Sequence, residues 1–209
     1  MLGPLHIAVL VSGAGSNLQA LLDAQMKGVL HSGRVALVVC DNPEAYALQR
    51  AKAAGVQTLV FDRKALGTVQ VEKNILMELH NRQVDLIVLA GFLMILSSDF
   101  VMRYTGRIIN VHPSLLPAFG GKGYYGLKVH QAALERGVKL SGATVHLVNE
   151  EPDGGPILMQ KAVRVLKNDT PETLQQRIMR QAEWQILPRA AQMLCKQLLK
   201  EAHDENHAT

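Results

Sequence analysis

The sequence predicts an α/β protein with a doubly wound, mostly parallel sheet, an antiparallel C-terminal hairpin and a C-terminal helix. Three observations support this prediction. Short apolar runs alternate with amphipathic stretches from Leu5 to Val111, residues 113–126 are rich in proline and glycine, and two further strand candidates flank a Gly-Gly-Pro turn. Successive βα units are typical of a parallel sheet with right-handed crossovers, and two strands joined by a short turn are typical of a hairpin.

Five continuous apolar runs are the candidates for the parallel strands: Ile7–Ser12, Val35–Cys40, Gln57–Phe61, Leu86–Ala90 and Arg107–Val111. Runs without polar alternation indicate strands that are buried on both faces. Between the runs, two sets of apolar residues recur at helical spacing: Leu18, Leu21, Leu22, Met26 and Val29, and later Val71, Ile75 and Leu79. These sets predict helices that connect the strands.

The C-terminal half begins with a long loop over 113–126. A helix is predicted over Leu127–Arg136, and the hairpin strands over Thr144–Val148 and Ile157–Val165. Asp169, with a glutamate three residues later, is the predicted N-cap of a helix that should kink or restart at Pro188. No linker interrupts the chain, so we expect one domain over 1–209, with a first half (1–112), a second half (113–200) and a frayed tail (201–209).

The composition excludes several classes of protein. A net charge of +4 suits an anionic small molecule, but the basic residues are scattered and aromatic residues make up 4%, which argues against a nucleic-acid binder. No apolar run is long enough to cross a bilayer and no signal peptide is evident. Cys40 and Cys195 lack metal-ligand spacing and are expected to be reduced thiols, so we predict a cytoplasmic protein.

A glycine-rich turn, Ser12–Asn17, follows the first strand and opens the first helix. Gly13 and Gly15 allow the backbone to approach an anion, and the N–H groups of a helix N-terminus favour a phosphate. The turn has neither the lysine of a Walker loop nor the third glycine of the dinucleotide fingerprint. The alternative is a tight turn in which Ser16 or Asn17 caps the helix.

A second motif, Asn110–Pro117, ends the fifth strand. Ligands of open α/β sheets bind beyond the carboxyl ends of the strands. Asn110 and His112 point to the same side of a strand because side chains alternate, so an amide donor and an imidazole are directed at one place. A buried structural histidine is the alternative for a single His, and the pairing with Asn110 favours a functional site.

Acidic residues gather in a third segment, Asn149–Pro156. On its own this segment is more typical of a solvated turn, and His146 upstream is more typical of a structural histidine. The histidine and acidic residues show no recognised metal spacing, so no metal site is expected.

Together these segments resemble the glycinamide ribonucleotide formyltransferase family of folate-dependent enzymes, which have a Rossmann-like formyltransferase fold. The matching segments are Ser12–Leu18, Ala90–Ser97, Asn110–Pro117, Gly142–Val148, Asp153–Pro156 and Glu183–Pro188. The resemblance implies a transferase of one-carbon metabolism that moves the formyl group of 10-formyltetrahydrofolate to the amine of glycinamide ribonucleotide in purine biosynthesis, without a metal. The implied partners are these two small molecules, with no nucleic acid or membrane, and the protein would be a monomer or homodimer.

The resemblance also implies a nucleotide-binding half over 1–112, a folate-binding and catalytic half over 113–200, and roles for individual residues. Asn110 would donate to the oxyanion, His112 would donate and transfer a proton, and Asp153 would orient His112. The substrate phosphate would be held by Gly13, Gly15, Ser16 and Asn17, and the rest of the ribonucleotide by Glu183. The folate would contact Leu93, Met94, Ile95, Leu96, Val148, Glu150 and Asp153, and His146 and Thr144 would support the site.

Two features depart from the family pattern. Many members have arginine where Met94 stands, so a contact that depends on that guanidinium is not expected here. The stretch Phe119–Gly126 is longer than in the shorter members and is predicted to form a flap, in which Lys122 could approach the substrate phosphate.

Three other functions remain as alternatives. Methionyl-tRNA formyltransferase and formyltetrahydrofolate hydrolase share the catalytic segment, but each normally has a further domain for which 209 residues leave little room. A non-catalytic nucleotide-binding regulator would not need Asn110, His112 and Asp153 together.

Overall fold

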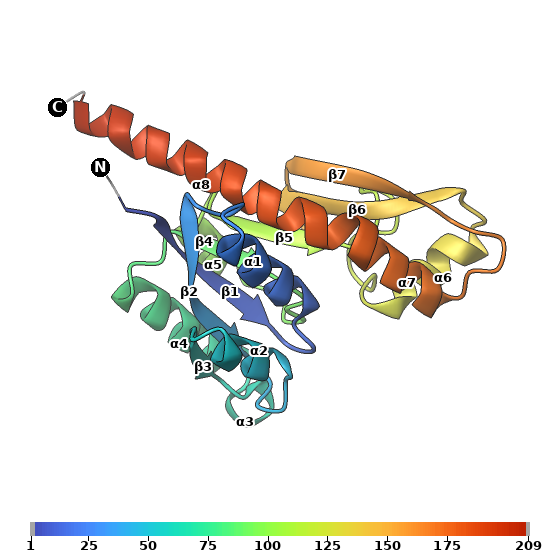
Figure 1. The fold of residues 1–209 in the computed structure, drawn as a ribbon. Helices are drawn as coiled ribbons and strands as arrows, with labels where there is room; N and C mark the ends of the chain where they lie inside the picture. The colour runs from blue at the N-terminus through green and yellow to red at the C-terminus, as the bar shows by residue number, and fades with distance from the viewer. Residues whose placement is uncertain (1–2, 208–209) are drawn as a thin grey trace. The chain divides into compact units, whose positions relative to one another are not determined.

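The computed structural model describes residues 3–207, with side chains up to residue 204. The chain divides into two compact units, one formed by the residues up to Leu96 and from Pro188 onward, the other by Ser97–Leu187. The ribbon is shown in Figure 1. All seven strands are members of one sheet, as the sequence predicts. Whether the chain is best described as one domain stays a prediction.

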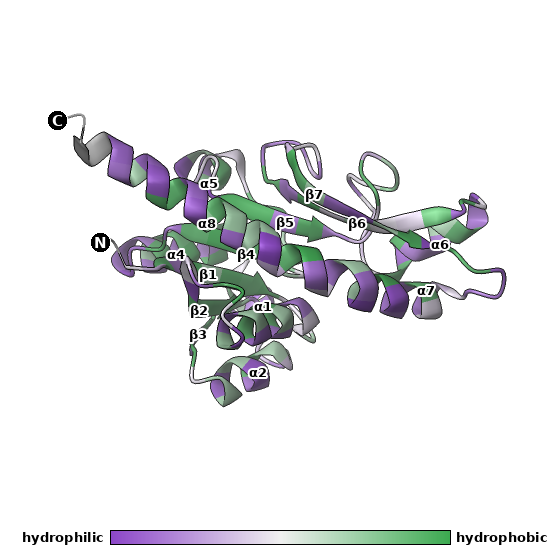
Figure 2. Ribbon diagram, turned by 45° about the horizontal axis from the view of Figure 1, so that its top comes forward, coloured by the Kyte–Doolittle hydropathy of each residue, from purple (hydrophilic) through white to green (hydrophobic). Residues whose placement is uncertain are grey.

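The first unit is built from alternating strands and helices: β1 (Leu5–Val11), α1 (Ser16–Met26), β2 (Gly33–Cys40), α2 (Ala47–Ala53), β3 (Gln57–Val60), α3 (Arg63–Leu66), α4 (Thr68–Asn81) and β4 (Leu86–Leu89). Its strands run in the order β3-β2-β1-β4, and each neighbouring pair is parallel. β1 therefore lies between β2 and β4 in the interior of the sheet, and Ile7–Val11 are fully buried. Figure 2 shows the apolar residues of β1, β2 and β4 in green, whereas the helices carry polar stripes.

The second unit contains the antiparallel strands. Its elements are α5 (Ser98–Arg103), β5 (Ile108–His112), α6 (Leu127–Glu135), β6 (Leu140–Leu147), β7 (Ile157–Arg164), α7 (Pro171–Ile178) and a π-helical turn, η1 (Met179–Glu183). β6 pairs antiparallel with β7, which confirms the predicted hairpin, and it also pairs antiparallel with β5. The hairpin strand β6 starts four residues before the predicted Thr144, and these additional residues, Leu140–Ala143, pair with β7.

The chain ends in the long helix α8 (Trp184–His207). A restart at Pro188 is wrong, because α8 is one helix across this proline, and the irregular turn is η1, directly upstream. A kink at Pro188 stays a prediction. The helix continues through His207, so most of the tail that we expected to fray is helical. Residues 208–209 of that tail lie outside the described residues.

The N-cap of α7 is Thr170, not Asp169 as predicted. Thr170 and Thr173 form a reciprocal capping box, in which each side chain accepts a hydrogen bond from the other's backbone N–H. The Asp169 carboxylate instead accepts from the Leu166 N–H and pairs with the Arg177 guanidinium. A strong charged partner in the last turn of α7 explains why the aspartate leaves the capping position to the threonine.

Candidate active site

Polar side chains from two antiparallel strands share one face of the second unit. Asn110 and His112 alternate along the end of β5, and their partners in the register of β6 are His146 and Thr144 respectively. Residues directly opposite each other in an antiparallel pair project to the same side of the sheet. His112 is 4% exposed and His146 is 2% exposed, so the face is nearly shielded from solvent.

Asp153 approaches this face from the turn that follows β6. The turn is tight: the Glu151 N–H donates to the Asn149 side chain, and the Gly154 N–H donates to the Glu151 carbonyl. A Cβ at Gly155 would lie 1.8 Å from the Leu147 carbonyl oxygen, so only glycine fits there. Asp153 itself adopts a left-handed conformation, with φ of 58°, which local polar side chains tolerate best.

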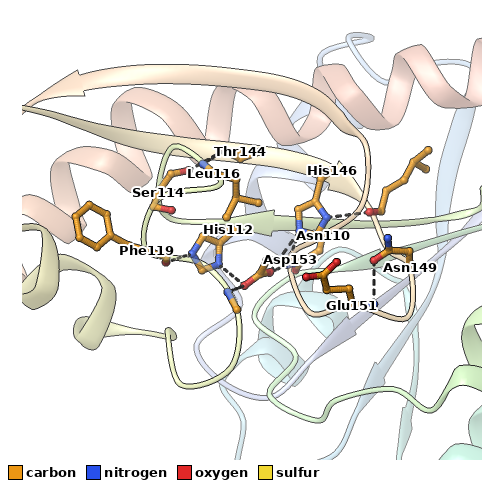
Figure 3. A network of polar contacts seen from close by, with 12 residues as sticks. Asn110, His112, Ser114, Leu116, Phe119, Thr144, His146, Asn149, Glu151 and Asp153 are labelled. Carbon is orange, nitrogen blue, oxygen red and sulfur yellow. Dashed lines mark hydrogen bonds and ion pairs between the residues drawn. The ribbon is translucent and has the colours of Figure 1, made fainter.

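Four groups converge on the Asp153 carboxylate, as Figure 3 shows. Oδ2 lies 3.3 Å from His112 Nδ1 and accepts a 2.9 Å hydrogen bond from the Gly121 N–H. Oδ1 accepts from Asn110 Nδ2 at 3.4 Å and lies 3.5 Å from His146 Nε2. Asn110, His112 and Asp153 therefore lie together and His146 joins them, whereas their catalytic roles stay predictions.

Hydrogen bonds to backbone carbonyls determine where the imidazole protons lie. His112 Nε2 is 2.7 Å from the Phe119 carbonyl oxygen and His146 Nδ1 is 2.8 Å from the Leu147 carbonyl oxygen. Because a carbonyl only accepts, both nitrogens carry a proton. Nε2 of His146 lies 3.2 Å from Asn110 Nδ2 and 3.5 Å from Asp153 Oδ1: it accepts from the amide when the ring is neutral and donates to the carboxylate when the ring is protonated. In neutral His112, Nδ1 presents its lone pair to Asp153.

The pKa values of His112 and Asp153 indicate that this pair can accept one proton at neutral pH. Burial lowers the pKa of His112, and the opposing effects of the Asp153 charge and the Phe119 carbonyl do not reverse this. Burial alone would raise the pKa of Asp153, but the hydrogen bond from His146, the charge of His112 and the Gly121 N–H together lower it. At neutral pH the carboxylate is therefore ionised and His112 is neutral, so Nδ1 is a basic position whose protonated form Asp153 would stabilise.

The loop after β5 is held by Thr144. Its hydroxyl donates to the Ser114 carbonyl at 2.7 Å and accepts from the Leu116 N–H at 3.0 Å, and Gln160 donates to the same oxygen. Phe119 has a φ of 55°, an unfavourable conformation for a bulky residue, and this conformation accompanies the hydrogen bond from its carbonyl to His112. The supporting position predicted for Thr144 thus corresponds to a contact with the loop.

The glycine-rich turn lies in the first unit, between β1 and α1. Gly15 is the N-cap of α1, with φ of 70° and no side-chain capping bond, so neither Ser16 nor Asn17 acts as the cap. Among residues 3–207, the backbone N–H groups of Gly13, Ala14, Gly15 and Ser16 donate no hydrogen bond to the protein. Such N–H groups at a helix N-terminus suit an anion.

Comparison with known proteins identifies the family. Residues 5–191 match the model of the formyl transferase family. The chain belongs to this family. The family predicted from the sequence is therefore confirmed.

Relatives within the family are similar over most of this chain. It is 43% identical over 183 residues to phosphoribosylglycinamide formyltransferase of Haemophilus influenzae, covering 87% of this chain and 83% of the relative. It is 44% identical over 192 residues to the trifunctional purine biosynthetic protein adenosine-3 of Drosophila melanogaster, and spans 90% of this chain but 14% of that protein. The crystal structure of glycinamide ribonucleotide transformylase 1 from Symbiobacterium toebii superposes with a TM-score of 0.85, at 41% identity, covering 92% of this chain and 88% of that one. This similarity confirms the fold class.

The other residues suggested by the family pattern occupy varied environments. Leu93 and Ile95 are 57% and 68% exposed, whereas Met94 is buried at 5% and packs as core. Leu96 and Val148 are half-buried, and Glu150 and Lys122 are exposed. Glu183 is buried in the π-helical turn η1. The structure leaves the functional roles of these residues as predictions.

Three contributors to the site are not evident from the sequence. The Phe119 carbonyl and the Gly121 N–H are backbone groups, which no side-chain pattern reveals. The direct contact of His146 with Asn110 could have been found from the alternation of Thr144 and His146, had the register of β6 against β5 been known.

His130 on α6 also lies fully buried, and neither ring nitrogen has a partner among the described residues. Burial, with the nearby charge of His112, lowers the pKa of His130 to about 4.

In residues 3–204, whose side chains are described, no group of three or more His, Cys, Asp or Glu side chains is arranged to hold a metal ion. No helix in the same residues is both long and apolar enough to cross a membrane.

Proposed function

We propose that this chain transfers the formyl group of 10-formyltetrahydrofolate to the primary amine of glycinamide ribonucleotide, a step of purine biosynthesis. The convergence of Asn110, His112 and His146 on the Asp153 carboxylate carries this proposal. Attack of an amine on a formyl carbon creates a tetrahedral intermediate with an oxyanion. It therefore requires a hydrogen-bond donor, a proton acceptor and firm positioning of both substrates.

Asn110 is the proposed donor to the oxyanion. Its amide nitrogen donates to His146 at 3.2 Å and, more weakly, to Asp153 at 3.4 Å. Replacing the long hydrogen bond to Asp153 by one to the developing oxyanion costs little free energy. The hydrogen bond to His146 meanwhile keeps the amide in place. A preorganised donor of this kind contributes about a hundred- to a thousandfold in rate.

His112 and Asp153 are the proposed proton-transfer pair. The amine gains positive charge as it attacks, and its proton moves to the pair, where Asp153 stabilises the imidazolium. The same proton then passes to the departing folate nitrogen, so the pair ends unchanged. Both ring nitrogens of His112 are engaged in this structure. Nε2–H can therefore donate to the oxyanion only by exchanging its hydrogen bond to the Phe119 carbonyl for one to the formyl oxygen. Both oxygens are acceptors of the same kind.

The substrates are proposed to bind through other residues. Gly13, Gly15, Ser16 and Asn17 would hold the ribonucleotide phosphate, and Glu183 would contact the remainder of the ribonucleotide. For the folate, the exposed side chains of Leu93 and Ile95 offer apolar surface, whereas buried Met94 would act by packing beneath them. Leu96, Val148 and Glu150 complete the proposed folate contacts.

The test is to follow folate deformylation by absorbance, with and without glycinamide ribonucleotide, for the wild type and Asp153→Asn. We expect turnover that requires the ribonucleotide and falls about a hundredfold or more in the variant. Glu151→Gln is the matched control, because it removes an exposed carboxylate of the same turn. Turnover without the ribonucleotide would indicate hydrolysis, and absence of turnover would favour a binding protein.

A further inference from the structure

The first three carbonyl groups of the glycine-rich turn are bonded to one neighbouring segment, residues 42–50. Asn42 Nδ2 donates to the Ser12 carbonyl at 3.3 Å, and the Ala47 N–H donates to the Gly13 carbonyl at 3.1 Å. Arg50 Nε donates to the Ala14 carbonyl at 2.9 Å. Three consecutive peptide groups of the turn are thereby oriented by the start of α2 and the residues before it.

This arrangement determines where the N–H groups of the turn point. In a trans peptide the C=O and the following N–H point in opposite directions. Carbonyls directed at residues 42–50 therefore direct the N–H groups of Gly13, Ala14 and Gly15 to the opposite side of the turn. The turn and the segment 42–50 are also in close contact, since a Cβ added at Gly15 would lie 2.7 Å from the Ala47 Cβ. The segment 42–50 thus acts as a template for the anion-binding conformation.

Arg50 is the charged member of this template. Beyond the Ala14 carbonyl, its Nη1 donates to the Gln19 side chain on the first turn of α1 at 3.2 Å, and its guanidinium lies 5.0 Å above the Tyr46 ring. Among the side chains that the structure describes, up to residue 204, no carboxylate lies at ion-pair distance from Arg50. The planar guanidinium therefore bridges the turn and α1 while its charge stays uncompensated, which a lysine could not reproduce.

We propose that Arg50 is a positioning residue for phosphate recognition: it holds the Ala14–Gly15 peptide so that its N–H faces the substrate phosphate. The inference rests on the proposed function, which assigns the phosphate to this turn. Arg50 acts through the backbone, so its loss should weaken binding of the phosphorylated substrate and leave the chemical step at Asn110, His112 and Asp153 unaffected.

The test is a titration of ¹⁵N-labelled protein with inorganic phosphate, followed through the amide resonances of residues 13–18. We expect the Kd of Arg50→Ala to rise about tenfold, as befits a lost hydrogen bond from a charged group. The Kd of Arg50→Lys for phosphate should stay within about threefold of that of Arg50→Ala, because lysine keeps the charge but does not bridge the turn and α1. Lys52→Ala, which removes an exposed cation from the same helix, should bind like the wild type. Thermal unfolding of each variant verifies that it is folded.

Steady-state kinetics supply the second readout. For Arg50→Ala the KM for glycinamide ribonucleotide should rise about tenfold, with kcat and the KM for the folate within about twofold of wild type. Equal phosphate affinity in Arg50→Ala and wild type, or full recovery in Arg50→Lys, would overturn the positioning role. If wild-type amides 13–18 do not respond to phosphate while ribonucleotide-dependent turnover persists, the phosphate assignment fails and the inference with it, but the transferase does not.

Discussion

The glycine-rich turn of the first unit and the Asp153 cluster of the second unit are organised in opposite ways. The turn is defined by backbone groups: its carbonyls are bonded, its N–H groups are available, and Gly15 has a conformation and a clearance that only glycine provides. The cluster is defined by side chains, two imidazoles and an amide around one carboxylate. The turn therefore contains no group that titrates near neutral pH, whereas the cluster depends on where its protons lie.

The difference teaches how binding and chemistry can be separated in one chain. A backbone site has a constant partial charge and suits an anion that must be held unchanged through the reaction. A cluster of titratable groups suits a step in which charge and protons move. Substitutions in the turn should therefore appear in substrate affinity, and substitutions in the cluster should appear in the rate and its pH dependence.

The largest effect should come from the cluster itself. We expect His112→Ala to reduce kcat about a hundred- to ten-thousandfold, and Asn110→Ala about a hundred- to a thousandfold, since each removes a group that acts in the transition state. The double variant should lose much less than the product of the two, because residues that act as a unit are not additive. Single-turnover rates check this, and unchanged phosphate binding would support the separation. A selective loss of ribonucleotide affinity would contradict it.

Gly15→Ala should have the next largest effect, on binding. An added Cβ would approach the Ala47 Cβ to 2.7 Å in a left-handed conformation, at a cost of about 1–3 kcal/mol in strain. We expect the KM for the ribonucleotide to rise about tenfold or more with a smaller change in kcat. Gly28→Ala, also left-handed but with open space around the added Cβ, controls for strain alone. Equal effects of the two variants on KM would show that the turn needs no close approach.

The pH dependence of kcat/KM should change in variants of the Asp153 cluster and not in variants of the glycine-rich turn. Burial lowers the pKa of His112, so the acidic limb of the profile should lie below 6.5. The Asp153 charge raises that pKa, so Asp153→Asn should move the limb to still lower pH within its residual activity. Gly15→Ala should leave the limb where it is. A limb that moves upward in Asp153→Asn would contradict the proposed pairing.

The smallest effect concerns a carboxylate that is structural instead of catalytic. Hydrogen bonds from Arg177 lower the pKa of Asp169 to about 2, from 3.8. A lowered pKa in the folded state adds stability above pH 3.8 that is lost as the pH falls toward 2. Asp169→Asn should therefore reduce the free energy of unfolding by about 1 kcal/mol at pH 7 and by less at pH 3, as measured in urea. Glu135→Gln on α6 is the exposed control, and an equal loss at both pH values would contradict the prediction.

The sequence by itself determined most of the fold and part of the site. Apolar runs located the strands, because a strand buried on both faces leaves a continuous signature. The two-residue period of a strand brought Asn110 and His112 to one side without knowledge of any neighbour. Local patterns were less reliable where a distant partner competes, as when Arg177 draws Asp169 away from the N-cap that Thr170 occupies.

Only the tertiary structure decided the remaining contacts. His146 joins the cluster through the register of β6 against β5, the Phe119 carbonyl and Gly121 N–H join through the path of a loop, and Arg50 reaches the glycine-rich turn from the next helix. These contacts link residues that are separated in sequence, or they use backbone groups that every residue has. Neither kind leaves a periodic pattern in the sequence, so both become visible only when the strands and loops are in place.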